Sequence, residues 1–430
     1  MLHAERFENF CVYIFFKLNF TSITNIDFSK NNVIIIIKRS EGGLFTTEKI
    51  VIGMTGPFGS GCTYISKFVL AKLGYEYISL SEILRTIAEK QDSTRTELQD
   101  VGNSVREEKG YDYLAQEAIA RINSSGKTKF VVDSIRNTHE IDALRAEYSS
   151  FFLFAVWANR DVRWERTKDK YDGNGTLFDK DDKRDKDEKT ESGQQITLCY
   201  QMADVIILNE KTIHTEKTDE YKELSSVTKK YVELIEKTGK FEPTEMETLM
   251  TMAYANSMRS SCSQRKVGAL IIDEFGNAFS SGYNEVPSSE RPCKNTYGMC
   301  YRRFIRDKIE NKIKDTIGDE DKAKTVSEIV KRESKMLDYC RALHAEESAI
   351  VNMARLSVSA NLNKATLYTT TYPCNLCANK IAQVGIKNVV YYEPYPQKEA
   401  KDILNIHGVK QTPFEGVTFN GYFRFMEVLR

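Results

Sequence analysis

Apolar runs of strand length alternate with helical patterns in the first half of the chain. The strand-like runs lie at 50–55, 75–80, 130–133, 151–157 and 205–208. Between them, apolar residues recur at helical spacing, as at 65–73, where Gly74 ends the pattern. This alternation predicts an α/β fold with a mostly parallel sheet, in a first domain at 49–210.

The second half begins after a break in this pattern. We predict a helical linker at 211–243, and Thr244, with Glu247 as its capping partner, opens the next helix. That helix begins a second domain, at 244–430. A strongly charged insert at 302–335 within it also has a helical pattern.

Two segments stand apart from these domains. Residues 1–48 contain only short apolar runs, and we interpret them as an N-terminal extension with one or two appended strands. Residues 169–195 are almost wholly polar with dense mixed charge. This composition predicts a mobile loop, either a solvated insert or a lid over a ligand.

Composition limits the classes of function. The 430 residues include 61 Lys and Arg against 61 Asp and Glu, and 41% are hydrophobic. Such a neutral, globular chain has no overall basic field for a polynucleotide or an anionic membrane. Nine cysteines, an odd number, and apolar runs far shorter than the ~20 residues of a membrane span predict a reducing, cytoplasmic location with no membrane association.

Two short motifs about thirty residues apart carry the strongest chemical signal. His344 and Glu346 precede an apolar helical stretch, and Pro373 leads into Cys374 and Cys377, which share one face of a helix's first turn. Free N–H groups and the positive end of the helix dipole favour thiolates there. This is the H-x-E and P-C-x-x-C signature of zinc-dependent deaminases, and a zinc ribbon or a redox pair is the alternative.

The ligand set predicts a catalytic zinc. His344, Cys374 and Cys377 supply three protein ligands and leave a position for water, whose pKa Zn²⁺ lowers toward ~7. We expect Glu346 to take the proton of that water, protonate the ring nitrogen of the substrate and later protonate the departing ammonia.

A glycine-rich turn follows the first strand and opens a helix, which is the context of a phosphate-binding loop. The candidate nucleotide-binding residues are Gly56, Gly59, Ser60, Gly61, Thr63 and Asp133. Cys62 stands where such loops carry lysine, so we expect a nucleotide to bind, with Mg²⁺ at Thr63, but no efficient phosphoryl transfer. Asp133 has the place of a Walker B carboxylate, and a turn or capping aspartate is the alternative.

Residues 244–410 resemble the deoxycytidylate deaminase branch of the cytidine deaminase superfamily. The resemblance rests on Ser261-Cys262, on 267–269, on 281–284, on the two zinc motifs and on Val384-Gly385-Ile386. It implies a three-layer α/β/α domain that removes the C4 amino group of a cytosine nucleotide by hydrolysis. It also implies a substrate contact for Asn284, while Tyr283 is either a second contact or a packing residue.

Three further cysteines lie in the long segment between Asn284 and His344. Some deoxycytidylate deaminases hold a second, structural zinc just ahead of the H-x-E motif, and by that resemblance Cys293, Cys300 and Cys340 are candidate ligands. Three ordinary thiols are the alternative, because structural zinc usually takes four ligands.

The first half resembles P-loop nucleoside monophosphate kinases, with Arg95, Gln99 and Arg106 similar to part of their substrate-side helix. A degenerate kinase-like domain before a deaminase domain is similar to the bacterial anti-phage dCTP/dCMP deaminases. That resemblance implies conversion of dCTP and dCMP to dUTP and dUMP, depletion of the nucleotide pool during infection, a homo-oligomer, a nucleotide effector and an RNA antitoxin. The alternatives are a housekeeping deaminase that supplies dUMP for thymidylate synthesis, a polynucleotide cytosine deaminase, and a nucleotide-binding regulator that only retains zinc.

Overall fold

The computed structural model divides the chain into two units, Met1–Glu48 and Lys49–Arg430. The described residues are 26–27, 34–35, 49–89, 94–186, 188, 190–211, 218–333, 339–356, 361–394 and 398–427. In the first unit, β1 (Ile26–Asp27) pairs antiparallel with β2 (Ile34–Ile35), and the rest of the predicted N-terminal extension lies outside the described residues. Among the described helices, none is both long and apolar enough to cross a bilayer.

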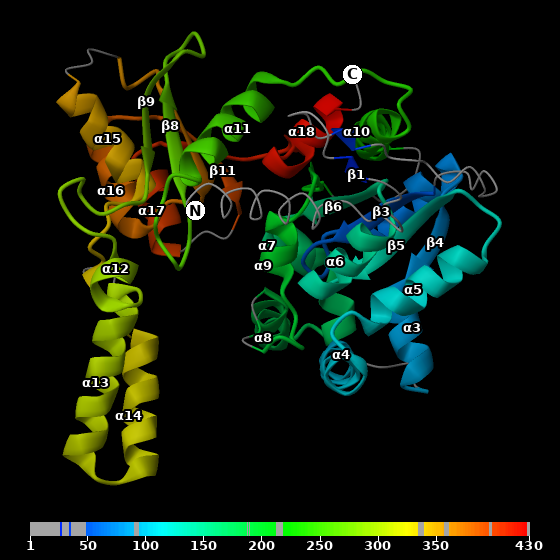
Figure 1. Cartoon of the computed structure of the whole chain (residues 1–430), viewed down its shortest axis with the longest axis horizontal. Coiled ribbons are helices and arrows are strands. Elements are labelled where there is room, and N and C mark those ends of the chain that lie inside the picture. The colour runs from blue at the N-terminus through cyan, green and yellow to red at the C-terminus, as the bar shows by residue number, and fades with distance from the viewer. Residues whose placement is uncertain are drawn as a thin grey trace. The chain divides into compact units, whose positions relative to one another are not determined.

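The phosphate-loop half of the second unit is built on a six-stranded sheet (Figure 1). Its strand order is β13-β7-β6-β3-β5-β4, and every neighbouring pair is parallel except β13 with β7. The strands are β3 (Ile50–Thr55), β4 (Glu76–Ser79), β5 (Lys129–Ile135), β6 (Phe151–Trp157), β7 (Val205–Leu208) and β13 (Gly416–Val417). The predicted, mostly parallel α/β sheet is therefore confirmed.

Helices cover both faces of this sheet because successive strand residues point to opposite sides. Val51 and Val132 enter one apolar core, and Ile52 and Val131 enter the other. The helices are α2 (Cys62–Ile65, continued by a π turn and a 3₁₀ turn through Leu73), α3 (Leu80–Ile87), α4 (Arg95–Lys109), α5 (Tyr113–Ser124), α6 (Thr138–Glu147), α7 (Arg160–Thr167), α8 (Gly175–Lys186), α9 (Ile196–Gln201) and α10 (Asp219–Ile235).

The deaminase-like half has a five-stranded mixed sheet of order β12-β11-β10-β8-β9. Its strands are β8 (Gly268–Ile272), β9 (Ala278–Tyr283), β10 (Thr366–Thr371), β11 (Asn388–Glu393) and β12 (Lys410–Pro413). One face packs against α15 (Ala345–Arg355), α16 (Asn375–Val384) and α17 (Lys398–Ile406), and the other packs against α11 (Glu245–Ser257). This arrangement is the three-layer α/β/α architecture that the resemblance implied.

The charged insert forms helices, as its pattern predicts. It forms α13 (Tyr301–Ile317) and α14 (Glu320–Glu333), which pack side by side (Figure 1), and the short helix α12 (Cys293–Tyr297) precedes them.

The two halves share one apolar core and are also joined by the C-terminal segment. Tyr200 of α9 packs with Leu249 of α11 and with Tyr392 of β11 in that core. After β12 the chain returns to the first sheet, where β13 extends its edge and α18 (Phe419–Glu427) packs on one face. Residues that the sequence pattern placed in the second domain thus complete the sheet of the first.

The prediction of a mobile loop at 169–195 is wrong for its central part, which forms α8. Phe178, Asp181 and Asp185 of this helix are buried. The two aspartates are polar residues in the sequence, but in the fold they bind partners on α4, and Asp185 also binds Arg136, which follows β5. They therefore face inward.

Candidate metal and catalytic centre

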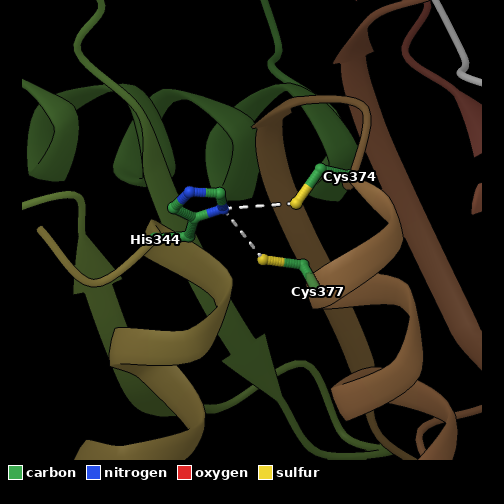
Figure 2. Close-up of side chains that lie close together, drawn as sticks. All are labelled: His344, Cys374 and Cys377. Carbon is green, nitrogen blue, oxygen red and sulfur yellow. Dashed lines mark hydrogen bonds between the residues drawn. The ribbon is translucent and has the colours of Figure 1, made fainter. Parts of the chain in front are cut away.

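Two helix N-termini bring the predicted zinc ligands together (Figure 2). His344 immediately precedes α15 and Cys374 immediately precedes α16, while Cys377 lies in the first turn of α16. His344 Nδ1 lies 3.3 Å from Cys374 Sγ and 3.4 Å from Cys377 Sγ. The three donor atoms all lie within 4.8 Å of one another. Thiolate and imidazole are donors that zinc prefers, so these residues fit Zn²⁺.

The cysteine pair favours one thiolate. The hydrogen bond from Cys377 and the interaction with His344 lower the pKa of Cys374 to about 4, against the effect of burial. Sharing that proton raises the pKa of Cys377 well above its usual value. Hydrogen bonds to Cys340 and Cys374 raise the pKa of His344 to about 10. The site therefore carries a negatively charged donor before any cation binds.

Glu346 lies beside these ligands in the first turn of α15 and is only 3% exposed. The Thr369 hydroxyl donates to Glu346 Oε1 over 3.4 Å, and the Cys377 thiol donates to Oε2 over 3.6 Å. Burial raises the pKa of Glu346. A carboxyl group whose pKa is raised toward neutral pH is suited to accept a proton and to return it.

Asn284 and Tyr283, at the end of β9, both contact other residues of the protein. The side-chain oxygen of Asn284 accepts from the Val267 N–H over 2.7 Å, and its amide donates to the Arg265 carbonyl over 2.8 Å. The Arg259 guanidinium lies 4.5 Å from the ring centroid of Tyr283. Asn284 thus braces the loop before β8, and a substrate contact for either residue stays a prediction.

Comparisons with known proteins agree with this geometry. A family model described as the cytidine and deoxycytidylate deaminase zinc-binding region matches residues 243–393, which contain all four motif residues. The deoxycytidylate deaminase of enterobacteria phage T2 is 34% identical over 175 residues, which are 38% of this chain and 88% of that protein.

The chain belongs to the deoxycytidylate deaminase family. The deoxycytidylate deaminase of Schizosaccharomyces pombe is 32% identical over 157 residues, which are 36% of this chain and 39% of that protein. The chain thus spans about two fifths of this yeast relative. A crystal structure of the cyanophage S-TIM5 dCMP deaminase with dCMP and dUMP matches with 26% identity and a TM-score of 0.28, over 40% of this chain and 99% of that one.

The first half of this chain also matches a family model. A family model described as an AAA domain matches residues 55–180. A UPF0200 protein of Methanothermobacter thermautotrophicus is 28% identical over 122 residues, which are 28% of this chain and 60% of that protein. The AAA-domain match covers the predicted phosphate-binding loop.

The loop lines a cavity of about 410 Å³ beside Asp133. Gly59 and Gly61 have φ of 82° and 105°, values that favour glycine, and a Cβ on Gly61 would meet the Asn209 amide at 2.3 Å. Thr63 donates to Asp133 over 2.7 Å, and a role for this pair in binding Mg²⁺ stays a prediction. The remaining predicted loop residues, Gly56 and Ser60, also line the cavity.

Cys62 does not replace the missing lysine. Its thiol donates to the Thr55 carbonyl over 3.2 Å, and burial raises its pKa to about 12, so it brings no charge to the cavity. Arg166 donates to the carbonyls of Gly59 and Ser60 and so braces the loop. The cavity also contains Arg136 and Lys170, and Lys170 Nζ lies 5.5 Å from the ring centroid of Phe58 in the loop.

The three candidate ligands of a second zinc gather around a smaller cavity, of about 30 Å³. Cys293, Cys300 and Cys340 line it together with Cys262, a fourth thiol that the sequence prediction missed. The sequence gives little reason to group Cys262 with the other three cysteines, because it lies 31 positions before Cys293. Among the described residues, only His344, Cys374 and Cys377 form a group of donor atoms within 4.8 Å. A second zinc site therefore stays a prediction.

Proposed function

We propose that the chain is a zinc-dependent hydrolase that deaminates deoxycytidine nucleotides, converting dCMP to dUMP and dCTP to dUTP. The observation that carries this proposal is the convergence of His344, Cys374 and Cys377 beside the buried Glu346. A structural zinc site needs no such carboxylate, whereas a hydrolytic site does. The printed names of the phage and yeast relatives support the same substrate class.

The chemistry divides between the metal and the carboxylate. When bound by His344, Cys374 and Cys377, Zn²⁺ supplies Lewis acidity, which turns a water molecule into a nucleophile near neutral pH. Glu346 would take one proton from that water and deliver it to the ring nitrogen. It would then take the second proton from the hydroxyl group formed at C4 and deliver it to the leaving amine. The C4–N bond breaks, a C4–O bond forms, and ammonia leaves. Thr369 holds the carboxylate by its hydrogen bond.

Deamination is tested on the full chain with dCMP, dCTP, dCDP, CTP and a cytosine-containing single-stranded oligonucleotide, from ammonia release and uracil absorbance. Glu346→Gln keeps the shape of the side chain but cannot carry a proton, so we expect a loss of at least about 100-fold in kcat with the zinc content unchanged. Turnover of dCTP supports depletion of the nucleotide pool in anti-phage defence. Turnover of dCMP alone favours thymidylate supply, and turnover of the oligonucleotide alone contradicts the proposal.

We further propose that the cavity at the phosphate-binding loop takes a nucleoside triphosphate with Mg²⁺ as an effector. Thr63 and Asp133 would hold the cation. Lys170, whose ammonium group lies near the ring of Phe58, would supply the positive charge that Cys62 lacks. Lys170→Ala is expected to weaken ATP binding about tenfold, as measured by calorimetry. Lys168→Ala is the matched control, because Lys168 pairs with Glu165 and does not line the cavity. Equal affinities in the two variants would contradict this role for Lys170.

A further inference from the structure

Glu393 is a buried acid that the proposed chemistry does not use. It ends β11, and its side chain is 7% exposed. One side-chain oxygen accepts from Gln201 Nε2 over 2.8 Å, and the other pairs with the Arg265 guanidinium. Its backbone carbonyl accepts from the Tyr372 N–H over 3.3 Å. A single residue therefore contacts the phosphate-loop half and two loops of the deaminase half.

The Gln201 contact leads back to the phosphate-binding cavity. Gln201 is the last residue of α9, a helix of six residues whose preceding residue is Gln195. The Gln195 N–H donates to the carbonyl of Arg136 over 2.8 Å, and Arg136 lines the phosphate cavity. The path from the cavity to Glu393 thus consists of one backbone hydrogen bond, a short helix and one side-chain hydrogen bond.

The other contacts of Glu393 lead to the catalytic centre. Tyr372 is two residues before Cys374, so its N–H bond to Glu393 fixes the chain as it enters the zinc motif. Arg265 lies on the loop that Asn284 braces through the Arg265 carbonyl. Glu393 therefore contacts the segment before a metal ligand through its backbone carbonyl, and it contacts the loop of a predicted substrate residue through its side chain.

We propose that Glu393 is a positioning residue through which the nucleotide-binding half controls the catalytic centre, with Gln201 as its contact on one side and Arg265 and Tyr372 on the other. This inference rests on the proposed function for its kinetic consequence only. The path itself is a feature of the fold, because its contacts run without a break from the phosphate cavity to the zinc motif, and the proposed coupling would follow it.

The test uses three variants of the full-length, zinc-loaded chain. Gln201→Ala removes only the contact from the phosphate-loop side, and Glu393→Gln keeps the acceptor for Gln201 but removes the charge that pairs with Arg265. Asn420→Ala is the matched control, since Asn420 donates to the backbone carbonyl of the same Gln201 over 2.8 Å and does not touch Glu393. Hydrogen exchange of the peptides covering 366–384 and the steady-state kinetics on dCMP are measured for each.

We expect Gln201→Ala and Glu393→Gln to exchange at least threefold faster at 372–377 and to lower kcat about tenfold with KM within twofold of the parent. The kcat of the double variant should be no lower than that of the less active single variant, because both substitutions interrupt the same path. A general loss of packing would instead lower the thermal midpoint and raise exchange throughout. Exchange in Gln201→Ala that equals the parent and Asn420→Ala would overturn the coupling. If no protein deaminates dCMP but the exchange pattern appears, the coupling stands and the proposed function fails.

Discussion

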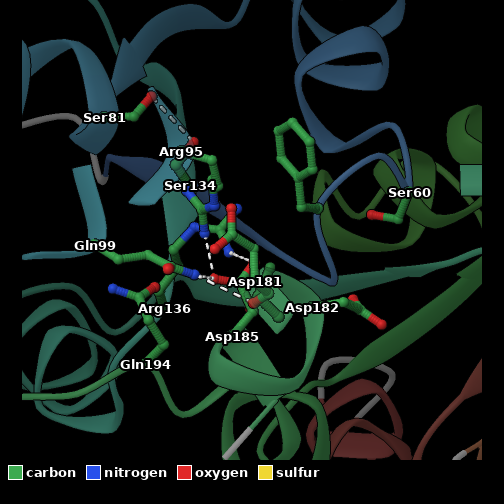
Figure 3. Close-up of polar contacts among 12 residues, drawn as sticks. Ser60, Ser81, Arg95, Gln99, Ser134, Arg136, Asp181, Asp182, Asp185 and Gln194 are labelled. Carbon is green, nitrogen blue, oxygen red and sulfur yellow. Dashed lines mark hydrogen bonds and ion pairs between the residues drawn. The ribbon is translucent and has the colours of Figure 1, made fainter. Parts of the chain in front are cut away.

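At the scale of single residues, Asp185 shows how one buried charge fixes a segment (Figure 3). Its carboxylate accepts hydrogen bonds from Gln99 and pairs with both Arg95 and Arg136. Burial alone would raise the pKa of Asp185, but the two guanidinium groups hold it below its usual value. Because the folded pKa lies below the unfolded one, Asp185 stabilises the fold above its unfolded pKa of about 4. This stabilisation is lost as the pH falls through the folded pKa.

Asp185→Asn should lower the free energy of unfolding by about 3 kcal/mol at pH 7, because it leaves two largely buried guanidinium groups without their counter-charge. The difference from the parent should shrink as the pH falls below about 4. Urea unfolding followed by tryptophan fluorescence measures this free energy of unfolding, because both tryptophans, Trp157 and Trp164, lie in the phosphate-loop half.

Asp179→Asn is the control for this prediction. Asp179 lies on the same helix, but its ion pair with Arg160 is exposed, so the cost should stay below about 1 kcal/mol. An equal loss in the two variants, or a difference that does not shrink as the pH falls below about 4, would contradict the assignment.

At the scale of elements, the sequence patterns correctly predicted the features that depend on residues close together in the chain. The buried strand β6 is a continuous apolar run, and β3 and β5 each contain a shorter one. The zinc ligands follow from the spacing of two short motifs at helix starts. In contrast, α8 was missed because its inward face holds aspartates whose partners lie up to 90 residues away. Glu393 was missed for the same reason, since 192 residues separate it from Gln201. A polar residue can be buried where distant residues supply its hydrogen-bond or ion-pair partners. The apolar periodicity of its own segment does not reveal those partners.

At the scale of the whole molecule, the C-terminal helix α18 ties the two halves into one folding unit. Phe425 is 1% exposed and stacks on Phe152 of β6 with ring centroids 5.2 Å apart. Arg424 pairs with Asp204 and donates to the Phe151 carbonyl. The chain leaves the first sheet after β7, builds the deaminase-like half and then returns. Residues more than 200 positions downstream therefore complete the core of the nucleotide-binding half.

This topology predicts that a substitution at the far C-terminus unfolds the phosphate-loop half. Phe425→Ala removes a fully packed ring and should lower the free energy of unfolding by about 3–5 kcal/mol. Tryptophan fluorescence during urea unfolding measures the stability of the phosphate-loop half, because both tryptophans lie in that half and neither lies near position 425 in the sequence. Phe423→Ala, on the same helix but 53% exposed, should shift the midpoint far less. If Phe425→Ala left the tryptophan transition unchanged, α18 would be an attached helix, and the two halves would be separable domains.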